Sequence, residues 1–284
     1  KLMYLNKKNT ENQITVIIPL YKTPVKNIKV FNQYKNFQLV VLDQCPDIEV
    51  SSKIKKLNLE YYSIKKNIGL SKATNFLLSK VKTKYCLFTQ ADILINHKSI
   101  NLLKIEMAKK NNIIFSGPRF VKKFFLKNIK RNKNNTKVVK NLNAACMLCD
   151  VKKIKKIGFF DEDFFLYWED IFLMDKINKS KYKMLFVPNA LAIHGGGKST
   201  KDNFKIKFIR TCNFKYGELI YAYKLKKSIF LKIIRQSIQN LLFIILNSLI
   251  FDVYSVLKNL AFLVGILKFI KFYFNKKISS LLNL

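Results

Sequence analysis

Short β-branched runs that alternate with helical patterns constrain the fold of this chain most strongly. Residues 14–20 read ITVIIPL, which is typical of a strand buried on both faces of a parallel sheet. We expect further strands at residues 37–42, 59–64, 85–89, 113–117 and 183–187, the last of them ended by Pro188. Between them the pattern predicts helices from Pro24, from about Ser71, over residues 99–110 and from about Trp168. Strands alternating with helices indicate βαβ units, so we expect an α/β fold with a parallel or mixed sheet flanked by helices.

Polar residues follow two of these expected strands directly. Asp43 comes after residues 37–42, and Gln90-Ala91-Asp92 comes after residues 85–89. Ligands of open α/β sheets bind at the carboxyl ends of the strands, so this edge is the expected site. The chain contains neither GxGxxG nor GxxxxGK[ST], so the sequence supports neither a dinucleotide-binding fingerprint nor a P-loop.

Residues 158–170, GFFDEDFFLYWED, concentrate acidic and aromatic side chains. They hold five of the 17 acidic residues of the chain together with its only tryptophan, Trp168. A carboxylate pair beside large rings is partly removed from water, which raises a carboxyl pKa and suits the pair to proton transfer. The alternative is an acidic first turn of a helix, where carboxylates favour the helix dipole.

His194 precedes three glycines in a chain that has only eight. Glycine permits close approach of the backbone to a ligand, and a carboxylate with an imidazole can hold a divalent metal. Asp92 and His194 are therefore candidate metal ligands.

The net charge of +36 invites a nucleic-acid interpretation, which the composition disfavours. Of the 53 basic residues only four are arginine, the residue that nucleic-acid readers prefer for bidentate contacts. Such a surface favours anionic lipid and phosphorylated substrates instead. The five cysteines are odd in number and lie mostly in apolar runs, which indicates a reducing compartment, and Cys146-x-x-Cys149 is interpreted as two small buried residues.

Two further segments are interpreted from composition alone. Residues 1–13 are polar and lack an apolar core, so we expect no signal peptide. Residues 122–140 are basic and rich in asparagine, and we expect a mobile surface loop there.

The character of the chain changes after residue 200. Residues 201–284 hold fifteen basic and three acidic residues among long apolar runs. Residues 241–251 are too short to span a bilayer, which needs ~20 residues, and residues 253–270 contain Lys258 and Lys268. We expect a basic amphipathic helical tail on an anionic membrane surface; a helical hairpin packed on protein, or a true membrane span, are the alternatives.

Taken in order, IIPLYK, VVLDQ, NIGLSKATN, TQAD, GFFDEDFFLYWED and IHGGGKS resemble the family-2 glycosyltransferases of the GT-A fold, and most closely their rhamnosyltransferase-like branch. The resemblance covers residues 14–199. It implies a catalytic domain over residues 1–200, followed by the tail over residues 201–284. The enzyme would be cytoplasmic and peripheral on the cytoplasmic face of the membrane.

The resemblance also assigns roles to individual residues. The donor, a nucleotide-diphosphate sugar, would be bound by Pro19, Tyr21, Asp43, Asn67, Gly69, Lys72, Asn75, Gln90 and Asp92. Asp92 and His194 would hold Mg²⁺ or Mn²⁺. Asp170 would be the general base, with Glu169 as the alternative, and Trp168 would contact the acceptor.

The activity implied is inverting transfer of a sugar, rhamnose or another hexose, to a saccharide or polyprenyl-linked acceptor in cell-surface polysaccharide synthesis. Two departures from the family pattern stand out: Gln90 replaces the first acid of the family's DxD motif, and Phe172 replaces an acid that many relatives carry. An inactive binding module of the same fold is therefore the alternative, and a nucleic-acid-binding protein ranks below it.

Overall fold

The computed structural model describes residues 13–121, 135–195, 199–200 and 203–282. The chain forms two compact units. Unit 1 comprises Lys1–Asp161 and Leu173–Lys201, and unit 2 comprises Glu162–Phe172 and Asp202–Leu284. The expectation of no signal peptide, at residues 1–13, falls almost wholly outside the described residues.

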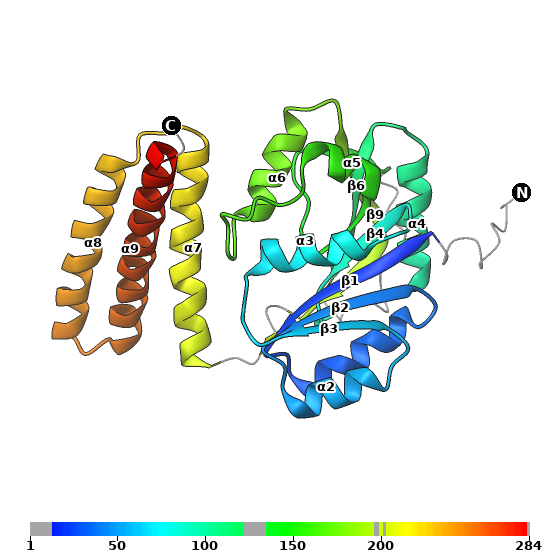
Figure 1. The fold of residues 1–284 in the computed structure, drawn as a ribbon, viewed down its shortest axis with the longest axis horizontal. Helices are drawn as coiled ribbons and strands as arrows, with labels where there is room; N and C mark the ends of the chain where they lie inside the picture. The colour runs from blue at the N-terminus through cyan, green and yellow to red at the C-terminus, as the bar shows by residue number, and fades with distance from the viewer. Residues whose placement is uncertain (1–12, 122–134, 196–198, 201–202, 283–284) are drawn as a thin grey trace, which may run out of the picture. The chain divides into compact units, whose positions relative to one another are not determined.

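Unit 1 is built on a sheet that is parallel in its first half. β1 (Ile14–Tyr21) pairs in parallel with β2 (Gln38–Gln44) and β4 (Tyr85–Thr89), and β2 pairs with β3 (Glu60–Ile64). The described strands follow the order β3-β2-β1-β4-β8-β6-β9-β5. The first three lie side by side in Figure 1.

The second half of the sheet makes it mixed. β8 (Cys146–Asp150) is antiparallel to both β4 and β6 (Ile113–Val121), while β9 (Lys183–His194) is parallel to β6 and antiparallel to β5 (Ile93–Ile95) and β7 (Lys137–Val139). The mixed α/β sheet that the sequence predicted is confirmed. Cys146 and Cys149 are fully buried in β8 as free thiols, as expected.

Two expectations about these strands are wrong. Pro188 does not end the last strand, because β9 continues to His194 and the β6–β9 register shifts from Val187 to Leu191, which accommodates the proline. Part of the expected loop at residues 122–140 is also ordered, since β7 pairs with β9. Residues 122–134 of that loop lie outside the described residues.

The helices of unit 1 cover both faces of the sheet. They are a 3₁₀ helix η1 (Val25–Tyr34), α2 (Ile48–Lys55), α3 (Leu70–Lys80), α4 (His97–Ala108), α5 (Val151–Ile157) and α6 (Glu169–Asn178). The division between the units falls within α6. Side chains alternate along a strand, so Val16 and Ile18 of β1 join the core with η1 and α2, whereas Ile17 joins the core with α3. Figure 1 shows α2 and α3 on opposite sides of the sheet.

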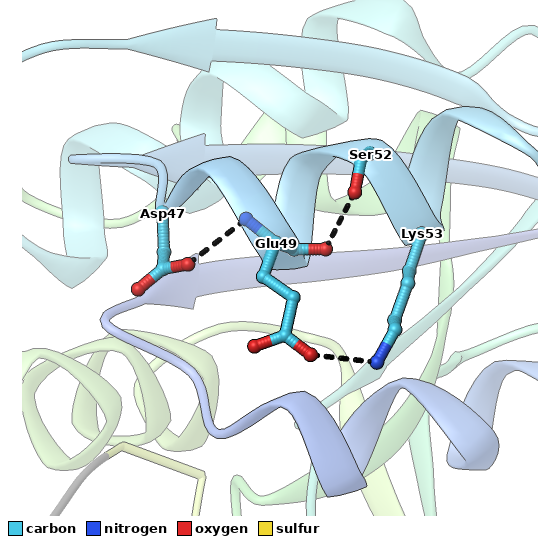
Figure 2. Close-up of polar contacts among 4 residues, drawn as sticks. All are labelled: Asp47, Glu49, Ser52 and Lys53. Atoms are coloured by element: carbon cyan, nitrogen blue, oxygen red, sulfur yellow. Dashed lines mark hydrogen bonds and ion pairs between the residues drawn. The ribbon is translucent and has the colours of Figure 1, made fainter.

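The short helix α2 is held by polar contacts of its own residues (Figure 2). Asp47 caps it by accepting a hydrogen bond from the Glu49 backbone N–H at 3.0 Å. The Glu49 carboxylate pairs with Lys53 Nζ at 2.8 Å, and the Ser52 hydroxyl donates to the Glu49 carbonyl at 2.9 Å. These contacts stabilise an eight-residue helix that would be only marginally stable in isolation.

Unit 2, in the part that the structure describes, consists of three helices and the segment 162–172. α9 (Val253–Leu282) lies between α7 (Phe204–Lys224) and α8 (Phe230–Leu249), as Figure 1 shows. The backbones of α7 and α9 approach closely at Gly265, where a Cβ atom would lie 2.5 Å from the Cys212 carbonyl oxygen. The buried core residues are Phe164, Tyr216, Leu219, Ile220, Ile266 and Phe269. Sequence patterns did not predict that residues 162–172 would join the C-terminal helices.

Much of the apolar surface of α8 and α9 is exposed. Leu231, Leu246 and Leu249 of α8 are 72%, 56% and 71% exposed, and Leu267 of α9 is 63% exposed. Among the described helices, one segment, Val253–Ser279, is long and apolar enough to cross a membrane, judged by length and composition only; 28% of its most apolar window is buried.

Candidate functional site

Three parallel strands of unit 1 end at one edge of the sheet. The register pairs Leu20 with Asp43 and Tyr21 with Gln44, so the carboxyl ends of β1 and β2 coincide. β4 is parallel to β1 and leads directly into Gln90. Five predicted donor residues, namely Pro19, Tyr21, Asp43, Gln90 and Asp92, therefore lie on or just after the carboxyl ends of neighbouring strands.

Asp43 is 2% exposed and accepts a hydrogen bond from the Tyr61 hydroxyl at 3.2 Å. Burial raises the pKa of the Asp43 carboxyl, and the Tyr61 hydrogen bond opposes that rise. Tyr61 was not predicted as a site residue. The parallel pairing of β2 with β3 brings it beside Asp43, and no local sequence signal could have identified it.

The turn before α3 is fixed by side-chain oxygens. Gln44 accepts a hydrogen bond from the Ile68 N–H at 2.8 Å, and Asn67 accepts one from the Gly69 N–H at 3.0 Å. Gly69 has φ = +88°, a conformation that L side chains rarely adopt, which explains the glycine here. The exposed Lys72 lies in the first turn of α3, where backbone N–H groups attract anions.

Asn75, in the middle of α3, has a structural contact. Its amide nitrogen donates to the Phe160 carbonyl at 2.9 Å, and its amide oxygen accepts from the Phe160 N–H at 3.1 Å. This reciprocal pair holds the start of the acidic segment against α3.

The two predicted metal ligands lie together. β5 pairs Ile93 with His194, and this register places His194 Nε2 3.7 Å from Asp92 Oδ2. The Gly195 N–H donates to the Asp92 carbonyl at 2.9 Å, and a Cβ on Gly195 would lie 3.0 Å from the Asp92 Cβ. Asp92 and His194 are about a hundred residues apart in sequence, so the sequence alone did not show that their side chains lie side by side.

This pair fits a divalent cation, although it is not a complete ligand set. His194 Nε2 is buried without a hydrogen bond to any described residue, and an imidazole nitrogen beside a carboxylate is a usual donor set. The described residues contain no group of three His, Cys, Asp or Glu side chains that could hold a metal. Water and donor phosphates would have to supply the remaining ligands, as is common for Mg²⁺.

In unit 2 the segment before α6 has a strained turn. Tyr167 and Trp168 have φ angles of +69° and +71°, which is uncommon for bulky residues. Gly217 of α7 permits the turn, because a Cβ there would lie 2.8 Å from the Tyr167 carbonyl oxygen. Trp168 packs on Phe214 and Tyr221, with ring centroids 5.6 and 5.2 Å away.

The adjacent carboxyls of Glu169 and Asp170 differ in environment. Glu169 is 5% exposed, and burial together with the neighbouring Asp170 charge raises its pKa to about 8. Asp170 is half-buried; burial raises its pKa too, while its Oδ1 accepts the Ile171 N–H at 2.9 Å. At neutral pH Glu169 is mostly protonated, so Asp170 is the better proton acceptor of the two.

Comparison with known proteins identifies relatives of the chain. The sequence profile of the family described as Glycosyl transferase family 2 matches residues 15–174. An N-acetylglucosaminyl-diphospho-decaprenol L-rhamnosyltransferase of Mycobacterium tuberculosis is 34% identical over 59 residues, 21% of this chain and 19% of that protein. The matched region is thus about one fifth of the relative's length.

Solved structures share the fold. A mannosyltransferase from Pyrobaculum calidifontis, in complex with GDP-Man and Mn²⁺, superposes with a TM-score of 0.56 at 15% identity, covering 75% of this chain and 64% of that one. Residues 1–349 of S. aureus TarS, in complex with UDP-GlcNAc, superpose with a TM-score of 0.54 at 16% identity, covering 74% and 66%.

Proposed function

The chain belongs to glycosyl transferase family 2 and has the GT-A fold, and from this premise we propose that it is an inverting glycosyltransferase. It would move a sugar from a nucleotide-diphosphate donor to a saccharide or lipid-linked acceptor. The observation that carries the proposal is the set of polar residues at one sheet edge, ending in the Asp92–His194 contact.

The donor would lie at this edge of unit 1. Tyr21 and Pro19 would contact the base, and the Asp43 carboxylate, oriented by Tyr61, would accept a hydrogen bond from it. The exposed Lys72, in the first turn of α3, suits the diphosphate. Asp92 and His194 would hold Mg²⁺ or Mn²⁺, which when bound supplies positive charge to the departing diphosphate.

Asp170 would act as the general base. Its carboxylate takes the proton of the acceptor hydroxyl while the hydroxyl oxygen bonds to the anomeric carbon. The bond from that carbon to the donor diphosphate breaks, and the nucleoside diphosphate leaves. Attack on the face opposite the leaving group inverts the configuration. Trp168 offers an aromatic face to the acceptor.

The sugar and acceptor are proposed from the relatives. The mycobacterial relative is a rhamnosyltransferase whose name gives a decaprenol-diphosphate-linked acceptor. We propose a deoxyhexose such as rhamnose, or another hexose, and a polyprenyl-linked acceptor in cell-surface polysaccharide synthesis.

Nucleotide-sugar binding is tested first by thermal stabilisation. A ligand at ~100 times its Kd should stabilise the protein by about 2.7 kcal/mol, which shifts the melting temperature measurably. We expect one nucleotide class and its sugars to produce the shift, and Mn²⁺ to enlarge it. Asp92→Asn should reduce the enlargement by Mn²⁺, whereas Glu60→Gln, at a distant exposed acid of β3, should not. No shift across all nucleotide-sugars would contradict the proposal.

An inactive module of the same fold is the second candidate, and Gln90 favours it. A neutral amide replaces one anionic ligand of the metal motif, so metal affinity falls. Slow release of nucleotide from the donor in the absence of acceptor separates the candidates, because a binding module releases none.

We further propose that unit 2 attaches the enzyme peripherally to the cytoplasmic face of a membrane with anionic lipids. Exposed leucine, isoleucine and phenylalanine side chains of α8 and α9 offer apolar area for insertion. Fifteen basic against three acidic residues in 201–284 match an anionic surface. Attachment would place the enzyme on the surface that holds a lipid-linked acceptor.

Surface variants of α8 test this attachment. Leu242→Gln, Leu246→Gln and Leu249→Gln combined should weaken binding to phosphatidylglycerol vesicles at least ~10-fold, since each buried leucine contributes about 1.5–3 kcal/mol. These side chains are more than half exposed, so the fold should survive. Ile48→Gln, at an 88% exposed apolar side chain of unit 1, is the control. Unchanged vesicle flotation of the triple variant would refute membrane attachment through α8.

A further inference from the structure

An open groove of ≈ 450 Å³ runs along one face of α9 in unit 2. Its α9 residues recur every three or four positions, so they form one stripe of the helix. The residues that characterise it are Lys268, Lys271, Phe272, Asn275, Lys276 and, from the segment 162–172, Asp163. Three ammonium groups therefore face one carboxylate.

Lys268 is a partly buried cation without a carboxylate partner among the described residues. Its Nζ donates to Asn213 Oδ1 at 2.5 Å and lies over the rings of Tyr216 and Phe165, 4.5 and 4.6 Å from their centroids. Burial lowers its pKa. Amide and ring contacts hold the ammonium in place but do not neutralise it, so an anion in the groove would stabilise its charged form.

The remaining charges of the groove also favour an anion. Lys271 makes no hydrogen bond or ion pair with any described residue, and its side chain is exposed. Asp163 is shared by two lysines: Lys224 Nζ lies 2.5 Å from Oδ2 and Lys276 Nζ lies 3.4 Å from Oδ1. One carboxylate cannot balance these cations, so the groove stays positive.

Apolar side chains border the groove on the same helix. Leu267 and Phe274, four residues before and three after Lys271, are 63% and 56% exposed. Ile278, four residues after Phe274, is 53% exposed. A basic stripe beside an apolar stripe fits a ligand that is a phosphate at one end and a hydrocarbon at the other.

We propose that this groove binds the diphosphate of an isoprenoid lipid, the carrier part of the acceptor. Lys268 and Lys271 contact the phosphate oxygens, and the side chains of Leu267 and Phe274 lie against the isoprenoid chain. A diphosphate offers several anionic oxygens to lysines that are spaced along the stripe. This site deepens the proposed function and rests on it.

Binding to vesicles tests the proposal with the full chain. The probes are phosphatidylcholine vesicles with decaprenyl diphosphate, vesicles of the same charge made with phosphatidylglycerol, and free pyrophosphate. The double variant Lys268→Gln/Lys271→Gln should weaken binding to the diphosphate vesicles at least ~10-fold, because two charge-assisted contacts are lost. The control Lys258→Gln/Lys277→Gln removes the same charge from α9 outside the groove, so it should weaken binding clearly less than the groove variant does. Lys271→Gln alone should show part of the loss and leaves the Lys268–Asn213 contact intact.

The outcomes separate the sources of the phosphate. Equal losses on phosphatidylglycerol vesicles would make the groove a general headgroup site and overturn the proposal. If pyrophosphate bound as tightly as the lipid diphosphate, the isoprenoid chain would contribute nothing and the proposed lipid ligand would be wrong. Equal effects of the groove and control variants would show that the groove does not bind the diphosphate. Donor-induced thermal stabilisation of the same variants reports on unit 1. A retained donor shift with no lipid effect would refute only this site, whereas no donor shift in the wild type would refute the glycosyltransferase proposal itself.

Discussion

Replacing Asp170 with asparagine is expected to lower kcat by ~10²–10⁴-fold, the range that general-base catalysis typically contributes. Asparagine keeps the shape of the side chain and can still accept the Ile171 N–H, which Asp170 Oδ1 accepts at 2.9 Å. It cannot take a proton from the acceptor. Steady-state kinetics with donor and acceptor measure the fall, and thermal stabilisation by the donor should be unchanged.

Glu169→Gln is the matched control for this prediction. Since the pKa of Glu169 is raised to about 8, its carboxyl is mostly protonated at neutral pH, and glutamine is a close neutral replacement. We therefore expect a much smaller loss of kcat. If Glu169→Gln were the inactive variant and Asp170→Asn turned over normally, the two roles would be reversed.

Replacing Phe164 with alanine is expected to reduce the free energy of unfolding by about 3–5 kcal/mol, as is usual for a buried phenylalanine. The side chain is fully buried in the core of unit 2 and packs against Phe172 at a centroid distance of 5.4 Å. Its removal leaves a cavity beneath the segment that carries Asp170. Denaturant unfolding followed by tryptophan fluorescence is a suitable measurement, because Trp168 packs in the same core.

Phe230→Ala controls for the loss of a phenylalanine as such. Phe230 lies on α8 in the same unit and is 71% exposed, so its truncation should change stability by no more than about 0.5 kcal/mol. Equal effects of the two substitutions would show that Phe164 is not buried in a packed core.

The parallel half of unit 1 was predictable because its strands leave a local signal. Residues 14–20 are a β-branched run, and residues 37–42 are an apolar run with Val40 and Val41. Both are largely buried and match β1 and β2 closely. β8 was missed because Cys146-Met147-Leu148-Cys149 has neither alternation nor β-branched residues. β5 and β7 are three residues long, so each depends on its partner β9 rather than on its own pattern.

Those residues of the candidate site that lie in recognisable motifs could be predicted from the sequence. The order of six motifs indicated Asp92, His194 and Asp170, and the β5–β9 register brings the first two into contact. Tyr61 could not be predicted, since its contact with Asp43 depends on strand pairing across 18 residues. The groove on α9 could not be predicted either, because one of its lining residues, Asp163, lies more than a hundred residues before Lys268 in the sequence.

Unit 2 combines segments that are far apart in the sequence, and this determines when during synthesis the unit can fold. Phe164 and Phe269 share one core, so the segment 162–172 has no complete partner surface until α9 has been synthesised. A ribosome-bound chain that ends before α9 would contain every described strand of unit 1 and would still lack the core that packs against the segment carrying Asp170. Long-range closure of this kind is slow compared with local helix formation. The segment that carries Asp170 and the lysine groove would therefore become ordered together, once α9 has been synthesised.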